Sequence, residues 1–299
     1  MNATLIVPFV PASWEQVTDS TFGTTNINAV TSNGIGEYIA VGSSGKLAIS
    51  SDAINWTSKD SSFDGSNIYA VAYGDGIYVI GGSSGKMAVS SDGGQTWTPV
   101  PSSFGASTIL AITYSPSASL WVAAGGSGKL ATSIDGLSWT QRTSSFSTTF
   151  INGLYSSSNL IVAVGFDGKL ATSTNGTSWT QRSSSFVTSS IYAVSSDTNT
   201  SRYVAVGDSG KIAFSTNGTS WTQAFPATSF GNSIIKAVDA TAEVYVAGGV
   251  LGKIGTSYDS IIWTQRTSTF GVENVNGLYF DSRGVAVAVG NSGKIAYSL

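Results

Sequence analysis

Short apolar runs separated by glycine- and serine-rich turns make up the whole chain. In the unit from Ile68 to Val100, apolar runs at 68–73, 77–81, 86–90 and 97–100 alternate with turns at 74–76, 82–85 and 91–96. Such runs are typical of β-strands joined by tight turns, because glycine accepts the positive φ that these turns need. A helical apolar periodicity with caps does not occur, so the pattern predicts an all-β fold.

Three landmark residues recur seven times along the chain. A lysine ends each Gly-x-x-Gly-Lys motif, and the lysines follow one another every 40 to 43 residues. The lysines are Lys46, Lys86, Lys129, Lys169, Lys211, Lys253 and Lys294; the tryptophans are Trp14, Trp56, Trp97, Trp139, Trp179, Trp221 and Trp263; the phenylalanines are Phe22, Phe63, Phe104, Phe146, Phe186, Phe230 and Phe270. A period of about 42 residues with four short strands per unit is typical of propeller blades.

The repeat therefore predicts a seven-bladed β-propeller with four antiparallel strands in each blade, formed by residues 1–299 as a single domain. The last repeat stops at Leu299, before its tryptophan strand, whereas Trp14 to Val17 form a tryptophan strand that precedes any complete unit. We expect the N-terminal strand to complete the last blade and close the ring. The predicted blades are 27–58, 68–100, 109–142, 151–182, 191–224, 234–266, and 275–299 together with 13–17.

The turn before each tryptophan resembles the Asp box of BNR repeats. Residues Ser90 to Trp97 match the pattern Ser-x-Asp-x-Gly-x-Thr-Trp in full, and the other copies, such as 133–139 and 173–179, are one residue shorter. The resemblance implies a structural hairpin at the edge of each blade. It implies no particular activity, because Asp-box propellers include sialidases, other glycan hydrolases, photosystem assembly factors and receptor ectodomains.

Composition argues against an enzyme. The chain has no histidine and no cysteine, which excludes Ser-His-Asp triads, histidine–metal sites and thiolate chemistry. A glycosidase that uses only carboxylates stays open, but the four glutamates lie in no distinctive motif. The Gly-x-x-Gly-Lys motif is too short for a phosphate loop and precedes a strand rather than a helix. We therefore expect no catalytic residue, no cofactor and no metal.

The seven lysines and Trp121 are the candidate ligand-binding residues. Seven lysines at equivalent hairpin ends should form a ring near one face, close to the phenylalanine connections between blades. They could bind sugars or acidic groups, with weak sites gaining strength through avidity. Alternatively, each lysine stem covers apolar surface while its ammonium bonds a turn or a neighbouring blade. Trp121 occupies the same position of the second strand as Tyr38, Tyr78, Tyr203 and Tyr245. These aromatic rings could be platforms for sugar binding, or they could pack in the core between blades.

The biological setting is inferred from composition. Only 10% of residues are charged and the net charge is −3, so no basic field would attract nucleic acid or acidic membranes. No run of about 18 apolar residues occurs, so we expect no membrane insertion. The Ser/Thr-rich, cysteine-free repeats resemble virion-associated propellers of bacteriophages, which implies a tail or surface protein for attachment or assembly, in a virion or outside the cell. Its partners would be other virion or scaffold proteins, or cell-surface glycans. The alternatives are a multivalent soluble lectin and a scaffold similar to photosystem assembly factors.

Asymmetric features are the other places to look for a unique site. They are Trp121, the complete Asp box at 90–97, and the longer connection that contains Phe225 and Pro226.

Overall fold

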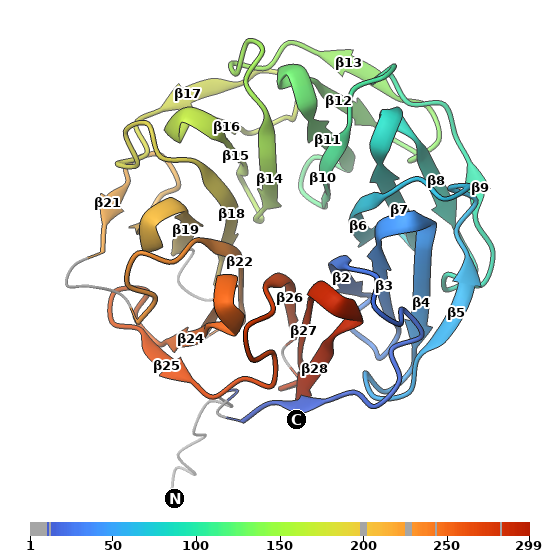
Figure 1. The fold of residues 1–299 in the computed structure, drawn as a ribbon. Helices are drawn as coiled ribbons and strands as arrows, with labels where there is room; N and C mark the ends of the chain where they lie inside the picture. Colours follow the sequence, from blue (N-terminus) through green and yellow to red (C-terminus); the bar gives the residue numbers. More distant parts are fainter. Residues whose placement is uncertain (1–10, 12, 198–201, 225–228, 243, 282) are drawn as a thin grey trace, which may run out of the picture.

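The computed structural model describes residues 11, 13–197, 202–224, 229–242, 244–281 and 283–299. Seven four-stranded antiparallel sheets stand around a central axis like the blades of a propeller (Figure 1). The predicted all-β, seven-bladed architecture is confirmed. The connection at Phe225 and Pro226, which the sequence singled out, lies outside the described residues.

The first three blades run in sequence order from the inner to the outer strand. Blade 1 consists of β2 (Ile27–Ser32), β3 (Tyr38–Gly42), β4 (Lys46–Ser50) and β5 (Thr57–Asp60). Blade 2 consists of β6 (Ile68–Gly74), β7 (Ile77–Gly82), β8 (Met87–Ser90) and β9 (Thr98–Pro99). Blade 3 consists of β10 (Ile109–Ser115), β11 (Leu120–Gly125), β12 (Leu130–Ser133) and β13 (Thr140–Arg142).

Blades 4 to 6 repeat this order. Blade 4 consists of β14 (Ile151–Ser156), β15 (Ile161–Gly165), β16 (Leu170–Ser173) and β17 (Thr180–Arg182). Blade 5 consists of β18 (Ile191–Ser196), β19 (Tyr203–Gly207), β20 (Ile212–Ser215) and β21 (Thr222–Gln223). Blade 6 consists of β22 (Ile235–Ala240), β23 (Tyr245–Gly249), β24 (Ile254–Ser257) and β25 (Thr264–Arg266).

Blade 7 is assembled from both ends of the chain, as predicted. It consists of β26 (Val275–Phe280), β27 (Ala286–Gly290), β28 (Ile295–Ser298) and β1 (Glu15–Gln16). Strand β1 pairs antiparallel with β28, Glu15 opposite Tyr297, and the Val17 amide donates to the Ile295 carbonyl at 2.9 Å. The outer strand of the last blade is therefore supplied by the start of the chain, beside the C-terminus in Figure 1.

The turn between the second and third strands differs from the predicted tight hairpin. In every blade it is a short 3-10 turn whose middle residue has a φ between 54° and 58°. These turns are η1 (Ser43–Gly45), η2 (Ser83–Gly85), η3 (Gly126–Gly128), η4 (Phe166–Gly168), η5 (Asp208–Gly210), η6 (Val250–Gly252) and η7 (Asn291–Gly293). All seven lie at the same end of their blades, and we call this side of the disc the 3-10 face.

The core lies between neighbouring blades. One cluster joins Val162 and Val164 of blade 4 to Tyr203 and Ala205 of blade 5, and each pair of neighbours repeats this arrangement. The small residue of the third strand, such as Ala48 or Ala171, is fully buried. At Gly255 an added Cβ would lie 3.0 Å from the Phe230 ring, so a small residue here is needed for the blades to approach closely.

The turns that precede the tryptophans are held by local hydrogen bonds at the opposite end of the blades. Asp92 accepts hydrogen bonds from the Ser90 hydroxyl and the Thr96 amide, while Trp97 donates from its indole to the Gly94 carbonyl. Hydrogen bonds from the Thr96 hydroxyl, the Thr96 amide and the Ser90 hydroxyl lower the pKa of Asp92 to about 2. The turn therefore has the geometry that local side-chain chemistry predicts.

Candidate functional site

The lysine ring is engaged by the protein itself. In all seven blades the lysine ammonium donates a hydrogen bond to the carbonyl of the phenylalanine in the connection that precedes its blade, at distances of 2.7 to 3.2 Å. The phenylalanine rings are buried beneath these connections. The lysines thus lie on one face near the connections, as expected, and their contacts are those of the structural alternative. Ligand binding by this ring stays a prediction.

Trp121 lies in the inter-blade core rather than on a surface. Its side chain is 0% exposed, and its ring centroid is 5.1 Å from that of Tyr114. Within the described chain its indole nitrogen has no hydrogen-bond partner. A completely covered ring offers no face to a sugar, so the structure assigns this aromatic position to packing between blades.

In blades 1, 2, 5 and 6 the tyrosine at the position of Trp121 forms a hydrogen bond to the preceding blade. Tyr78 of blade 2 donates its hydroxyl proton to the Glu37 carbonyl of blade 1 at 3.3 Å. Tyr203 of blade 5 lies 2.8 Å from the Ser157 hydroxyl of blade 4. Burial raises the pKa of Tyr78, so its hydroxyl keeps the proton that it donates. The aromatic rings therefore belong to the hydrophobic core, and their hydroxyl groups form hydrogen bonds between blades.

The central channel is lined by the inner strands of all seven blades and has a volume of about 280 Å³. Asparagines close gaps between neighbouring inner strands at its mouth on the 3-10 face. Asn28 donates to the Ile68 carbonyl at 2.7 Å, Asn152 to the Ile191 carbonyl at 2.9 Å, and Asn276 to the Ile27 carbonyl at 3.0 Å. Side-chain hydrogen bonds therefore join neighbouring inner strands of the channel wall, in addition to the packing between blades.

Strand β22 carries two ionisable residues, of which Lys236 lines the channel. Lys236 is half-buried at the mouth, and its ammonium donates to the Asn276 side-chain oxygen at 3.1 Å. Asp239 lies deeper and accepts hydrogen bonds from the Ser195 hydroxyl and from the amides of Ala240 and Phe280. Burial raises the pKa of Asp239 to about 6, because removal from water disfavours the charged form more than these bonds favour it.

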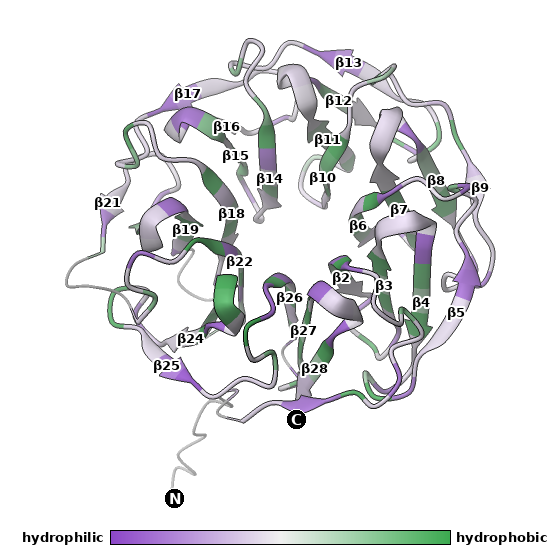
Figure 2. Cartoon of the chain, in the orientation of Figure 1, coloured by the Kyte–Doolittle hydropathy of each residue, from purple (hydrophilic) through white to green (hydrophobic). Residues whose placement is uncertain are grey.

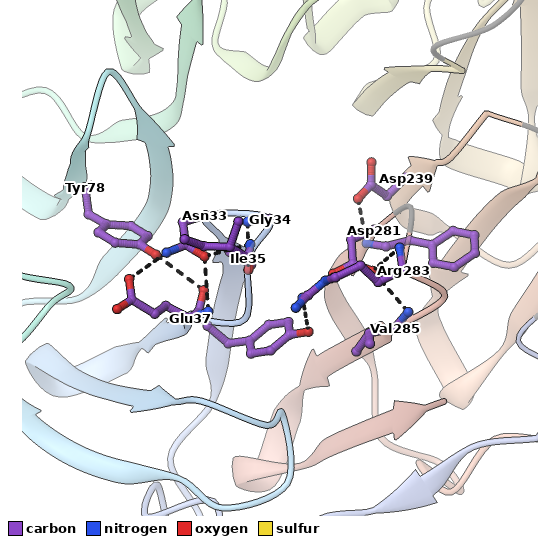
Figure 3. Close-up of polar contacts among 12 residues, drawn as sticks. Asn33, Gly34, Ile35, Glu37, Tyr78, Asp239, Asp281, Arg283 and Val285 are labelled. Carbon is purple, nitrogen blue, oxygen red and sulfur yellow. Dashed lines mark hydrogen bonds and ion pairs between the residues drawn. The ribbon is translucent and has the colours of Figure 1, made fainter.

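An ion pair lies at the seam between blades 7 and 1, on the face opposite the 3-10 turns. Arg283 pairs with Asp281 at 2.5 Å and donates a second bond to the Tyr38 hydroxyl (Figure 3). Nearby, Asn33 donates to the Glu37 carboxylate and accepts from the Ile35 amide, which orders the adjoining loop of blade 1. The sequence analysis missed this network, since nothing local to Arg283 indicates its partner in blade 1.

The 3-10 face carries exposed apolar side chains that the sequence analysis also missed. We define the apolar arc as Phe150, Phe166, Val187, Leu251 and Val272, which are 41%, 37%, 80%, 58% and 78% exposed. Figure 2 shows the coiled turn of blade 6 in green, whereas the turns of blades 1, 2 and 3 are pale. The detectable signal was the exchange of serine or glycine for an apolar residue inside an otherwise regular repeat.

Two features, a cluster of metal-ligating side chains and a membrane-spanning helix, are absent from the described residues. No group of three or more Asp and Glu side chains gathers there in a way that could hold a metal ion. In the same part of the chain, no helix is long and apolar enough to cross a bilayer.

Comparison with known proteins identifies a fold and not a family. No family model matches the chain, and no curated protein matches it. Among solved structures, YCF48 bound to a D1 peptide is 18% identical with a TM-score of 0.77, covering 98% of this chain and 96% of that one. Virginiamycin B lyase from Staphylococcus aureus is 13% identical with a TM-score of 0.81, covering 96% and 98%.

The WD40 propeller domain of Doa1 is 9% identical with a TM-score of 0.75, covering 95% of this chain and 96% of that one. At such low identities these structures show the shared architecture alone. The Asp-box and bacteriophage resemblances stay predictions. The chain is thus a seven-bladed β-propeller, similar over nearly its whole length to propellers of several different functions.

Proposed function

We propose that the protein is a non-enzymatic binding scaffold that docks a protein partner on its 3-10 face, over blades 4 to 6. The observation that carries the proposal is the apolar arc. The corresponding turns of blades 1, 2 and 7 present Ser44, Ser84 and Ser292 instead. Exposed apolar and aromatic side chains that lie over neighbouring blades are typical of protein interaction sites.

The aromatic part of the arc forms a preorganised cluster at blade 4. The rings of Phe150 and Phe166 stack with their centroids 5.4 Å apart, and Phe166 meets Tyr192 of blade 5 edge-on at 6.4 Å. Tyr192 also lines the channel mouth. Rings that already hold one another lose little conformational entropy on binding, which favours their use as anchors.

Two members of the arc hold a backbone conformation that costs free energy. Val187 has a φ of 62° and Leu251 a φ of 58°, in the left-handed region that branched or bulky residues rarely adopt. Gly231 and Gly271 occupy the position of Val187 in the connections that lead to blades 6 and 7, without this strain. Such strain costs roughly 1–3 kcal/mol per residue, and contact of the exposed side chain with a partner would offset it.

An enzymatic role and a sevenfold lectin have less support. The chain lacks histidine and cysteine, and the repeated lysines already bond main-chain carbonyls. A similar propeller, YCF48, has been solved with a bound peptide, which shows that the architecture accommodates such a ligand. As the setting we propose attachment or assembly in a bacteriophage virion or on a cell surface, because the charge-poor, cysteine-free composition suits a rigid extracellular disc.

The test is differential capture of a partner. Phe166→Ser removes the centre of the aromatic cluster, and Val187→Gly removes an exposed apolar side chain while relieving backbone strain. Ile134→Ser is the matched control, because Ile134 is 75% exposed but lies in an Asp-box turn at the opposite end of blade 3. Immobilised wild type and control should retain the same partner from native material, including purified virions, and the two arc variants should lose it.

Equal retention of that partner by all four proteins would overturn the docking proposal. A glycan array that shows strong binding, unaffected by Phe166→Ser, would favour the lectin alternative. Mass spectrometry of purified virions decides the setting separately, since absence of the protein there removes the virion role without touching the docking surface.

A further inference from the structure

Lys236 is the cation at the mouth of the central channel. It is the second residue of β22, and the first residue of that strand pairs with Gly249, directly before the turn η6. The mouth therefore opens on the 3-10 face. The equivalent residues of the other blades are neutral, namely Asn28, Tyr69, Leu110, Asn152, Tyr192 and Asn276.

Neighbouring groups fix the position of the Lys236 ammonium. Asn276 donates from its side-chain nitrogen to the Ile27 carbonyl at 3.0 Å and to the Asn291 side-chain oxygen at 2.9 Å. Because the nitrogen is committed to two acceptors, the side-chain oxygen of Asn276 must face Lys236, from which it accepts a bond of 3.1 Å. Lys236 is thus held at the channel wall by a neutral partner.

The nearby carboxylates are committed elsewhere. Asp239, three residues along the same strand, accepts from Ser195, Ala240 and Phe280. Asp208 on η5 accepts from the Ser190 amide at 3.1 Å. Over the described residues, no carboxylate oxygen lies within 4.0 Å of the Lys236 ammonium. An ammonium has three N–H donors, and the structure commits one of those of Lys236.

A half-buried cation with only an amide partner is energetically unfavourable. Desolvation lowers the pKa of Lys236, which reflects the same cost. Proteins usually pair such charges, because an ion removed from water without a counter-ion loses more hydration than one neutral hydrogen bond returns. An anionic group in the channel mouth would supply the missing partner.

We propose that the channel mouth binds a carboxylate-bearing ligand, with the Lys236 ammonium as the charged contact. A volume of about 280 Å³ accommodates a small organic acid or one acidic side chain and excludes a folded element. The carboxylate could thus come from a free metabolite or from an acidic residue of a docked partner. This site goes beyond the proposed docking function and does not depend on the apolar arc.

The repeat supplies a substitution that the fold already accepts. Asn occupies the position of Lys236 in blades 1, 4 and 7, so Lys236→Asn should fold and differ mainly in charge. Lys59→Asn is the matched control, because it removes one half-exposed lysine from the outer strand β5, far from the channel. Both variants lower the net charge equally.

Binding is measured by NMR titration of the isotope-labelled full chain at constant ionic strength near neutral pH. The probes are succinate, a capped Gly-Glu-Gly peptide, the neutral analogue succinamide, and chloride. We expect succinate or the peptide to shift the signals of Lys236, Asn276 and Tyr192 saturably, with a dissociation constant in the millimolar range. Binding should weaken at least about tenfold in Lys236→Asn and stay unchanged in Lys59→Asn.

The two carboxylate sources give different results. Saturation by succinate alone identifies a free organic acid, and saturation by the peptide identifies an acidic side chain; either result supports the site. Failure of both carboxylates to saturate the wild type, equal binding by Lys236→Asn, or equal binding of succinamide overturns the proposal. The Phe166→Ser variant should bind the carboxylate normally, so failure of the docking surface and failure of this site remain distinguishable.

Discussion

Arg283 of blade 7 donates a hydrogen bond to the Tyr38 hydroxyl of blade 1 at 2.7 Å, across 245 residues of sequence. The same guanidinium pairs with Asp281, whose side chain is only 4% exposed. The two blades that meet at the point of ring closure are therefore joined by a charged contact near one face, in addition to the β1–β28 pairing in the last blade.

Removal of Arg283 should loosen this seam. Arg283→Ala leaves the buried Asp281 carboxylate without its cation, and we expect a loss of about 2 kcal/mol in the free energy of unfolding, below the value for a fully buried pair because Arg283 is partly exposed. Tyr38→Phe removes one hydrogen bond only and should cost about 1 kcal/mol. Urea denaturation of both variants checks this, and an Arg283→Ala protein as stable as wild type contradicts it.

Closure by the N-terminal strand should dominate stability. Deleting residues 1–18 removes β1 and with it Trp14 and Val17, each 5% exposed. Burial of two such side chains is worth about 4–6 kcal/mol, so Tm should fall by roughly 10 °C or more. Differential scanning calorimetry measures this. A peptide of residues 11–19 added in trans should restore part of the lost stability. An unchanged Tm after the deletion would show that the N-terminal strand does not stabilise the closed ring.

Lysines of the ring should contribute in proportion to their bonds. Lys129 makes one hydrogen bond, to the Phe104 carbonyl, whereas Lys211 bonds both the Phe186 carbonyl and the Ser189 hydroxyl. Lys129→Met and Lys211→Met keep the apolar stem but remove the ammonium. We expect losses of about 1 and about 2 kcal/mol respectively, measured by chemical denaturation. Variants without any loss would leave the ring free for a ligand and revive the binding alternative.

Asp239 should give the protein a specific dependence on pH. Its pKa is raised from 3.8 to about 6, so the folded state favours the protonated form. The stabilisation from protonating Asp239 is fully present below its unfolded pKa and is lost as pH rises through about 6. The difference in unfolding free energy between wild type and Asp239→Asn should therefore change by about 3 kcal/mol across this window and level off on both sides.

Urea titrations at a series of pH values measure this difference. Asp52 and Asp92, whose pKa values are lowered to about 2, contribute oppositely: their stabilisation is present above 3.8 and is lost as pH falls through about 2. Their effect is therefore separate from that of Asp239. A wild-type curve parallel to that of Asp239→Asn across the whole range would contradict the raised pKa.

The sequence repeat was sufficient to predict the features that all blades share. The seven blades, the four strands in each and the shared last blade follow from spacing alone, because each unit must bury its faces against copies of itself. The position of the lysines beside the phenylalanine connections followed in the same way. Periodicity could not indicate that each ammonium bonds a main-chain carbonyl, since the sequence carries no signal for a carbonyl acceptor.

Features that break the repeat were harder to predict. Trp121 stood out by its residue type, yet it packs as the tyrosines at its position do. Arg283 and Tyr38 come into contact only because the ring closes, so the sequence around either residue does not indicate the other as its partner. Phe166 and Leu251 are single replacements in a turn, and only the structure shows that they share one exposed face. Lys236 required knowledge of which strand lines the channel.

The lysine contacts have a consequence for how the disc can change. Their acceptors are backbone oxygens, which every residue possesses, so the bond makes no demand on the side chains of the connection it holds. The residue after each buried phenylalanine is Gly, Asp, Ser or Val in different blades, while the lysine bond persists in all seven. One face of the ring is thereby free to acquire new surface chemistry blade by blade without loosening its assembly.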